Sequence, residues 1–451
     1  MLPICGVPTT IQRGLAPYRD LFCRDEGFAH ISRSITGLIL SPNKTLQGIY
    51  DVQVWDTESP RRRAMHAAVF EAQWDAEALM PRHRAVVAQD HGRRGREVIS
   101  LDWTLAHHEW GPEIYGVTKS YDYVERRMAR FQTVVTAVVA NRTLVDGIEV
   151  RVQAPNVCEA EEEYLRATGQ ERYEQLGQAR ERLLELLHHL RHRREYKKRT
   201  EIVVEIVEQL EREGHFPEAH YAFDNGVLTL ELAQVIEHKG KHWVSELECS
   251  RNVRWRGQWR RIDEVGAELR HHAPQSFRPL QVHCRNGETK TFWAFTKTMR
   301  LRRYGRKRIV IVHEREDLTD VPRFLLTDAL LWESGRIRET WSFRWTAELF
   351  HAFGKQGTGL EAAQVRTEEA VNRHLRFSCV AQSLVQRAPA SGAETERFAF
   401  AKGEPTLGQR CRAITREGLH GLLQFVAQLL GQGRSCEAIL GFFAQPPSCP
   451  A

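Results

Sequence analysis

The feature that most constrains the fold is a change along the chain from strand-like to mixed strand and helix patterns. Residues 96–104, 130–140 and 147–153 (REVISLDWT, RFQTVVTAVVA and GIEVRVQ) are rich in β-branched residues, which is typical of buried strands. Residues 219–226, AHYAFDNG, predict a further short strand, and residues 227–240 predict a helix after it. Strands that alternate with helices indicate an α/β core with a mixed sheet flanked by helices.

Two segments interrupt this pattern. Residues 158–213 are dense in Glu, Arg and Leu and contain no proline, which predicts long helices. They are compatible with a coiled-coil dimer arm or with a helical insertion packed on its own domain. Residues 241–255 predict a strand, and the chain from there to about 325 is β-rich, with Gly and Pro turns. We therefore expect an α/β core that is interrupted by a helical and a β-rich insertion.

Helical regions are expected at both ends of the chain. Residues 64–80 have helical apolar spacing, and residues 419–433 place six apolar residues on one stripe, a pattern more typical of core than of a dimer surface. The predicted organisation is a helical region (1–95), a first core segment (96–157), a helical insertion (158–215), a second core segment (216–240), a β-rich insertion (241–325), a third core segment (326–386), and a linker with a C-terminal helical region (387–451).

Composition sets few limits on function. The net charge is only +6 over 451 residues, which does not by itself indicate nucleic-acid binding. The nine cysteines are scattered without a C-x-x-C pair, which argues against a zinc site or disulfide framework and favours a reducing cytosol. The first residues lack a signal-peptide pattern, and no apolar run has membrane-spanning length. We expect a cytoplasmic protein with no membrane partner.

Basic residues are concentrated in three runs. Residues 297–308 hold seven basic and no acidic side chains, and residues 251–261 hold five, with Trp255 and Trp259 between them. Residues 191–199 hold six. Basic side chains neutralise phosphates, and interleaved aromatic side chains can stack on bases. The first two runs therefore predict DNA contacts, although solvated surfaces would have the same composition.

The most informative stretch, residues 341–356, places charges in an apolar helix. At 100° per residue, Trp341, Arg344, Glu348 and Lys355 lie within one 60° sector of the predicted helix. Most of the remaining surface is apolar. A buried helix with such a stripe either neutralises its own charges or presents them to a ligand.

Two aspartates suggest which ligand that is. Asp102 and Asp224 each come at the predicted end of a strand, and strand ends of an α/β sheet line a crevice. Asp102, Asp224 and Glu348 together would form an oxygen-rich anionic site suited to Mg²⁺. Two such ions could promote phosphodiester chemistry, with Arg344 and Lys355 holding the phosphate backbone.

The spacing Trp341-x2-Arg344-x3-Glu348-x6-Lys355 resembles the Tyr-x2-Arg-x3-Glu-x6-Lys signature of DDE transposases from bacterial insertion sequences. The neighbouring Lys355-Gln356 and Gly359-Leu360, the segments VISLDWT and HYAFDNG, and residues 40–55 are also similar to these enzymes. Trp341 stands where the family usually has Tyr, and Trp103 stands where a small or acidic residue is usual.

The resemblance implies an RNase H-like core in which Asp102, Asp224 and Glu348 bind two Mg²⁺ ions, which Mn²⁺ can replace. It implies cleavage at the ends of an insertion sequence and joining of the 3′-OH to target DNA, by a bacterial, nucleoid-associated protein that is a homodimer on double-stranded DNA. In relatives the β-rich insertion contacts DNA ends, and the resemblance implies that the N-terminal helical region (1–95) binds DNA as well. The expected DNA-binding residues are Trp341, Arg344, Lys355, Arg300, Arg302, Arg303, Arg306, Lys307, Arg254 and Arg256.

Other interpretations stay open at this point. A metal site at His107, His108 and Glu109 is a weak alternative, and Asp122 is either structural or a spare carboxylate. Glu333 and Glu339 rival Glu348 as the third carboxylate but lack its Arg and Lys neighbours. At the level of function, the alternatives are a decayed or domesticated transposase that only binds DNA, and a nuclease that cuts without joining.

Overall fold

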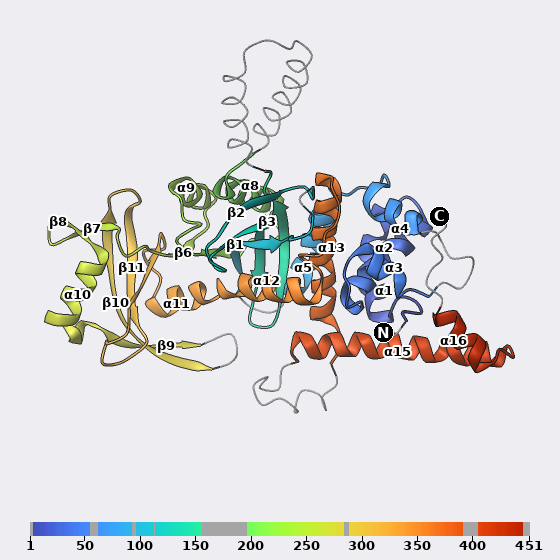
Figure 1. Ribbon diagram of the computed structural model, residues 1–451. Helices are drawn as coiled ribbons and strands as arrows, with labels where there is room; N and C mark the ends of the chain where they lie inside the picture. The colour runs from blue at the N-terminus through green and yellow to red at the C-terminus, as the bar shows by residue number, and fades with distance from the viewer. Residues whose placement is uncertain are drawn as a thin grey trace, which may run out of the picture.

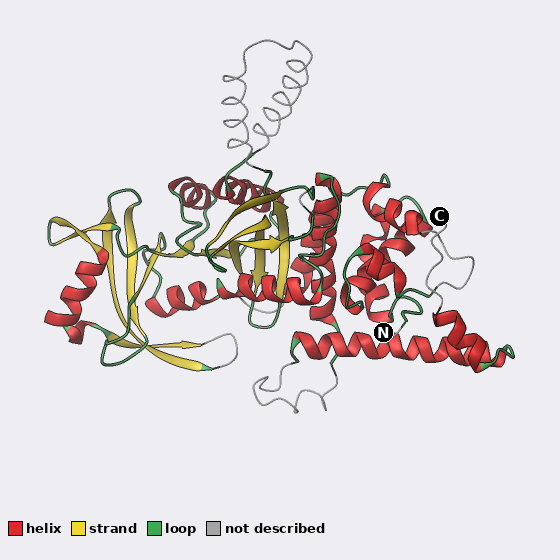
Figure 2. Cartoon of the chain, in the orientation of Figure 1, coloured by secondary structure: helices red, strands yellow, loops and turns green. Residues whose placement is uncertain are grey.

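The computed structural model describes residues 3–54, 62–92, 96–111, 113–155, 196–283, 288–390 and 405–444. Within these residues the chain is an α/β protein whose strands form one mixed sheet (Figures 1 and 2). The strands are β1 (Val98–His107), β2 (Val117–Asp122), β3 (Arg127–Ala140), β4 (Val145–Val152), β5 (His220–Phe223), β6 (Trp243–Glu246), β7 (Asn252–Trp255), β8 (Gln258–Arg261), β9 (Arg278–His283), β10 (Thr289–Leu301), β11 (Gly305–His313) and β12 (Arg323–Thr327).

The central region of the sheet has the order β4-β3-β1-β5-β6. Its first three strands are antiparallel neighbours, whereas β1, β5 and β6 run parallel to one another. Strand β12 then pairs antiparallel with β6 and carries the sheet into the β-rich part of the chain, in the order β12-β11-β10-β7-β8. Strand β9 joins the edge of β10. The predicted β-rich insertion is thus an extension of the central sheet.

Helices cover both faces of the central sheet. Helices α8 (Arg199–Glu213) and α9 (Leu230–His238) lie on one side, and α11 (Ser334–Ser342) and α12 (Trp345–Gly357) lie on the other (Figure 1). The alternation of side chains along β1 serves both layers, since Ile99 and Leu101 pack in the α8–α9 core while Val98 and Ala106 pack with α12. Helix α10 (Ile262–His272) and the 3₁₀ turn η3 (Pro274–Ser276) belong to the β-rich part.

The remaining helices form a separate layer beside the sheet. Helix α13 (Glu368–Arg387) packs on β4 and on α2, so it joins the central sheet to the N-terminal helices. The N-terminal elements are α1 (Thr9–Leu15), η1 (Ala16–Leu21), α2 (Asp25–Leu40), α3 (Leu46–Asp51), α4 (Arg62–His66), η2 (Ala67–Glu71) and α5 (Leu79–His91). At the C-terminal end, α15 (Leu407–Gly431) and α16 (Cys436–Ala444) extend away from the sheet (Figure 1).

Buried ion pairs fasten this helical layer to the sheet. The fully buried Arg84 of α5 pairs with Glu149 of β4 (2.7 Å) and with Glu213 of α8 (2.5 Å). Arg387 of α13 pairs with the buried Asp146 (2.8 Å). Because an unpaired charge at such depth would be costly, these pairs define one relative position of the helices and the sheet.

Several predicted boundaries are wrong. Strand β1 continues to His107, so Asp102 lies in the middle of the strand rather than at its end. Residues 241–255 form two strands, β6 and β7, which occupy different places in the sheet. Residues 64–80 are broken into α4, η2, a loop and the start of α5.

The predicted helix over 341–356 and the predicted helical insertion also differ from the structure. The first is interrupted, because α11 ends at Ser342 and α12 begins at Trp345. Of the second, residues 156–195 lie outside the described residues, and with them most of the basic run 191–199. Its described end, α8, packs in the core of the central sheet.

Candidate metal and DNA site

Asp102 and Asp224 are brought together by the parallel pairing of β1 and β5. Leu101 is the register partner of Phe223, so the next residues along the two strands are the two aspartates. Ser100 and Ala222, two residues earlier, are also partners, and Ala222 packs in the core beneath α12. Side chains two residues apart share a face of a strand, and both aspartates therefore project on the α12 side of the sheet.

Helix α12 carries the third carboxylate and is fixed along β1 at two points. The hydroxyl of Ser100 donates to the carbonyl oxygen of Arg344 (3.0 Å), and the ammonium of Lys355 donates to the carbonyl oxygen of Leu105 (2.5 Å). Glu348 lies on α12 between these two anchors, as Asp102 lies on β1 between Ser100 and Leu105. The helix therefore aligns Glu348 with Asp102.

A buried contact beneath the helix sets the same alignment. The Nε2 atom of His351 lies 2.7 Å from the hydroxyl of Thr136, which is the register partner of Asp102 on β3. Burial and the charge of Lys355 lower the pKa of His351 to about 3, so the ring is neutral. Sequence reasoning missed this pair, since 215 positions separate the two residues and neither belongs to a motif.

The electrostatics of Asp102 report the proximity of the three carboxylates. Burial raises the pKa of Asp102 to about 7, and the negative charges of Asp224 and Glu348 contribute to the rise. The backbone N–H of Trp103 and the guanidinium of Arg344 act in the opposite direction. We refer to Asp102, Asp224 and Glu348 as the carboxylate site. Its residues repel one another, and a cation bound among them would relieve that repulsion.

Each member of the carboxylate site has a partner in the protein. Glu348 pairs with Arg344 one turn earlier (2.6 Å), and one oxygen of Asp224 accepts the N–H groups of Gly226 (3.0 Å) and Val227 (3.1 Å). The three carboxylates do not converge on one point, since their oxygens are not all within 4.8 Å of one another. A donor set of three carboxylates on one face fits a pair of hard cations a few Å apart, which shares its ligands between two centres.

The group of described residues that does meet the 4.8 Å limit is His107, Asp122 and Glu125. His107 lies 2.8 Å from one oxygen of the buried Asp122, whose other oxygen accepts the N–H groups of Val124 and Glu125. These bonds join the end of β1 to the turn between β2 and β3, and they give Asp122 a structural role. The alternative site at His107, His108 and Glu109 is not formed, because His108 bonds Gln132 and Glu109 pairs with Arg127.

The rival third carboxylates lie elsewhere. Glu339 pairs with Arg96 (3.1 Å), which precedes β1, and with Arg142 (3.3 Å), which follows β3. Both partners belong to the opposite end of these strands from Leu105 and Lys355. Glu333 is exposed at the N-terminal cap of α11. Neither is among the largest influences on the pKa of Asp102.

The predicted DNA contacts of the β-rich part that are exposed differ in the partners they have within the protein. Arg300 and Arg306 are direct partners across β10 and β11, and Arg254 is opposite Trp259 across β7 and β8. Register and alternation place these four side chains on one face, and all are exposed. Arg303 is exposed in the turn after β10, Arg302 lies over the Trp259 ring, and Arg256 pairs with Glu268 (3.0 Å). Among the described residues, no ion-pair partner is found for Arg254, Arg300, Arg303 or Arg306.

Two of the residues predicted to contact DNA are buried in this structure. Lys307 is only 8% exposed and pairs with Glu237 of α9 (2.9 Å), so it stabilises the packing of α9 on the sheet. Trp341 is 7% exposed in the core beneath α11, with the guanidinium groups of Arg323, Arg338 and Arg344 against its ring. In both cases a neighbouring strand or helix covers a side chain that the sequence pattern left on the surface.

Arg344 and Lys355 are partly buried and already paired. Arg344 pairs with Glu348, and Lys355 pairs with Glu361 (2.7 Å) as well as with the backbone of β1. Their immediate role is to hold α12 and to compensate carboxylates. Contact with a phosphate would require them to share or exchange these partners.

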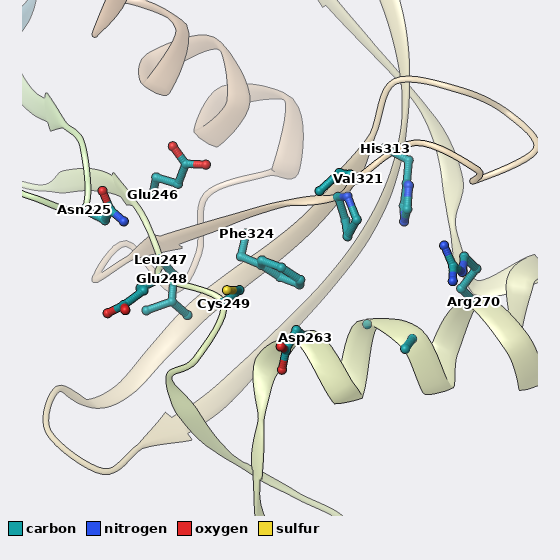
Figure 3. Close-up of a pocket in the computed structure, with 13 residues that line it drawn as sticks. Asn225, Glu246, Leu247, Glu248, Cys249, Asp263, Arg270, His313, Val321 and Phe324 are labelled. Atoms are coloured by element: carbon teal, nitrogen blue, oxygen red, sulfur yellow. The ribbon is translucent and has the colours of Figure 1, made fainter. Parts of the chain in front are cut away.

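A cavity of about 470 Å³ is lined by residues of β6, β12 and α10 and by Asn225, which follows β5 (Figure 3). Asn225, the neighbour of Asp224, and Glu246, at the end of β6, are on one side of it, and Asp263 and Arg270 of α10 are on another. Phe324 lies between them. Both the central sheet and the β-rich part therefore line the cavity, and Asp102, Asp224 and Glu348 are not among its lining residues.

Comparison with known proteins does not assign the chain to a family. The sequence matches no protein-family profile, and it has no significant match among curated proteins. Among the described residues, no helix is long and apolar enough to span a membrane. What this chain does has to be argued from its sheet, its carboxylates and its exposed cations.

Proposed function

We propose that the chain is a metal-dependent DDE transposase with an RNase H-like core. The observation that carries the proposal is the placement of Asp102, Asp224 and Glu348 on one face of the sheet, with Asp102 under the electrostatic influence of the other two. The strand order β4-β3-β1-β5-β6, with two antiparallel pairings followed by two parallel pairings, supports the RNase H-like assignment. The Arg344-x3-Glu348-x6-Lys355 spacing supports the transposase class.

In this proposal the carboxylate site would hold two Mg²⁺ ions, for which Mn²⁺ could substitute. Bound there, the ions would supply Lewis-acid activation of the nucleophile and stabilise the leaving oxygen of a phosphodiester. The chain's own residues supply position and charge. Asp102 has to release its proton to act as a ligand, and Glu348 has to share its carboxylate with a metal as well as with Arg344. Arg344 and Lys355 then lie next to the phosphate that reacts.

The proposed substrate is double-stranded DNA: the ends of the element and a target. The exposed Arg254, Arg300, Arg303 and Arg306 on the β-rich part support binding to DNA ends away from the carboxylates. A homodimer on the DNA belongs to the proposal. It is supported by α15, where Leu423 is 67% exposed and Leu430 is also exposed, so part of the predicted C-terminal stripe lies on the surface although Leu429 is buried.

Excision in cells tests the proposal. A marker flanked by the DNA that borders this gene is supplied with the protein in trans, as wild type and as Glu348→Gln. The proposal expects excision with the wild type and none with the variant, with both proteins equally abundant. Excision by both proteins would remove Glu348 from the chemistry. Binding of these ends without excision by either protein would instead favour the alternative of a decayed enzyme that only binds DNA.

A further inference from the structure

The hairpin formed by β2 and β3 exposes apolar side chains that the core does not explain. Tyr123 and Val124, in its turn, are 84% and 87% exposed. Tyr121 and Met128, which are register partners, are exposed as well, and Trp110, after the end of β1, is 91% exposed. Single exposed apolar residues are ordinary, but four on one hairpin indicate an interaction surface.

The same hairpin carries uncompensated positive charge. Lys119 and Arg130 are direct partners across β2 and β3, and both are exposed. Arg126 is exposed in the turn, with a positive φ of 54°. None of the three has an ion-pair partner among the described residues. Because like charges opposite each other destabilise a sheet, this arrangement favours an anionic partner that neutralises both.

The charged face of the hairpin is the face that carries the carboxylates. On β3, Thr136 is the partner of Asp102, and Arg130 and Met128 lie six and eight residues before it. Even separations keep side chains on one face, so Arg130, Met128 and their partners Lys119 and Tyr121 continue the face of Asp102. Six residues of extended strand span about 20 Å.

Contacts next to its turn make the hairpin a defined element. His107 of β1 lies 2.8 Å from the buried Asp122 on the opposite face, and Arg127 pairs with both Glu109 and Glu125. The rings of Tyr121 and Tyr123 meet edge to face at 5.1 Å. The acidic side chains of Glu109, Asp122 and Glu125 are therefore already paired. The face that carries Lys119 and Arg130, which we call the outer face of the hairpin, stays cationic.

We propose that the outer face of the β2–β3 hairpin binds the backbone of duplex DNA that runs from the carboxylate site, with Lys119, Arg126 and Arg130 on phosphates and Tyr121 and Tyr123 against the sugars. This inference rests on the proposed function. It adds a second anchoring surface, on the other side of the carboxylate site from Arg254, Arg300 and Arg306 in the strand order. At 3.4 Å per base step, the hairpin contacts phosphates about six steps from the reacting one.

Affinity for DNA is the first test. The full-length Lys119→Gln/Arg130→Gln variant and the wild type are titrated against a fluorescent duplex of roughly four helical turns, without divalent metal, over a series of salt concentrations. We expect about tenfold weaker binding and a salt slope lower by about 2, since each lost phosphate contact changes the slope by about 0.9. The matched control is Arg212→Gln/Lys239→Gln, which removes two exposed cations on the α8–α9 side and is expected to bind like the wild type.

Crosslinking locates the contact. A photoreactive benzoylphenylalanine in place of Val124 is expected to crosslink to DNA at a defined distance from the cut site, and the same group in place of Lys239 is not. Wild-type affinity and slope in the double variant would overturn the inference, as would crosslinks to a second copy of the chain. Loss of cleavage in Glu348→Gln with the hairpin crosslink retained would separate the two proposals, because hairpin binding needs no metal. A wild type that binds no duplex would overturn both.

Discussion

The central sheet and the β-rich part use charged residues in opposite ways. At the carboxylate site the cations are partly buried and paired: Arg344 with Glu348, and Lys355 with Glu361. In the β-rich part Arg254, Arg300 and Arg306 are exposed, and no ion-pair partner is found for them among the described residues. The first arrangement is a preorganised site, and the second is an exposed cationic surface. Clusters of basic residues therefore reveal little until it is known which of them are already neutralised.

The largest expected effect is a lower rate of strand cleavage with unchanged DNA affinity. Asp224→Asn is expected to lower the rate of strand cleavage with Mg²⁺ by on the order of 1,000-fold, because one carboxylate ligand of the ions is lost. DNA affinity without metal should be unchanged. Glu339→Gln is the control, since Glu339 only pairs with Arg96 and Arg142. A cleaving Asp224→Asn protein would show that the paired charges of the central sheet are structural.

The second prediction concerns the free energy of unfolding, which the partly buried Asp102 lowers when it is ionised. Its folded pKa of about 7 lies above the ordinary value of 3.8, so the folded state binds the proton more tightly. The stability that this proton contributes is present below pH 4 and is lost as the pH rises to 7 and beyond. Asp102→Asn should therefore raise the free energy of unfolding by about 2–4 kcal/mol at pH 8 and change it little at pH 4.

Thermal or denaturant unfolding of both proteins at the two pH values, in the absence of divalent metal, checks this prediction. With Mg²⁺ added at pH 8, the wild type should recover stability and the variant should recover less, because bound metal takes the place of the proton. An equal stability difference at pH 4 and pH 8 would contradict the assignment of the shift to Asp102.

A third prediction concerns the exposed cationic surface of the β-rich part. Arg300→Ala/Arg306→Ala is expected to weaken DNA binding roughly tenfold and to lower the salt slope by about 2, since two exposed cations are lost. Cleavage at saturating DNA should keep its wild-type rate, because neither residue contacts the carboxylate site. A reduced rate at saturating DNA with unchanged affinity would reverse the roles given to the two regions.

The smallest expected effect comes from the one cation of residues 297–308 that is buried and paired with a carboxylate. Lys307→Met should lower the stability by about 1 kcal/mol through the loss of the Glu237 pair, which is partly exposed on the glutamate side. DNA affinity and its salt slope should not change. Loss of affinity equal to that of Arg300→Ala/Arg306→Ala would show that Lys307 leaves its buried position to reach DNA.

The sequence predicted the α/β class and the main strands because those depend on local patterns. The β-branched runs became β1, β3 and β4, and HYAF became β5 immediately before Asp224. The break between α11 and α12 leaves the spacing of Arg344, Glu348 and Lys355 intact, since all three lie at or within α12. The sequence did not predict that Lys307 and Trp341 would be buried, because exposure depends on what a distant element covers.

By itself, the sequence determined which residues alternate along each strand and which charges share one side of a helix, because these follow from the period of the backbone. Only the tertiary structure decided that Leu101 pairs with Phe223 and that α12 lies along β1, and these two facts bring Asp102, Asp224 and Glu348 together. It also decided which cations are neutralised. Pairing partners such as Lys307 and Glu237 lie 70 positions apart, and no local pattern encodes such a contact.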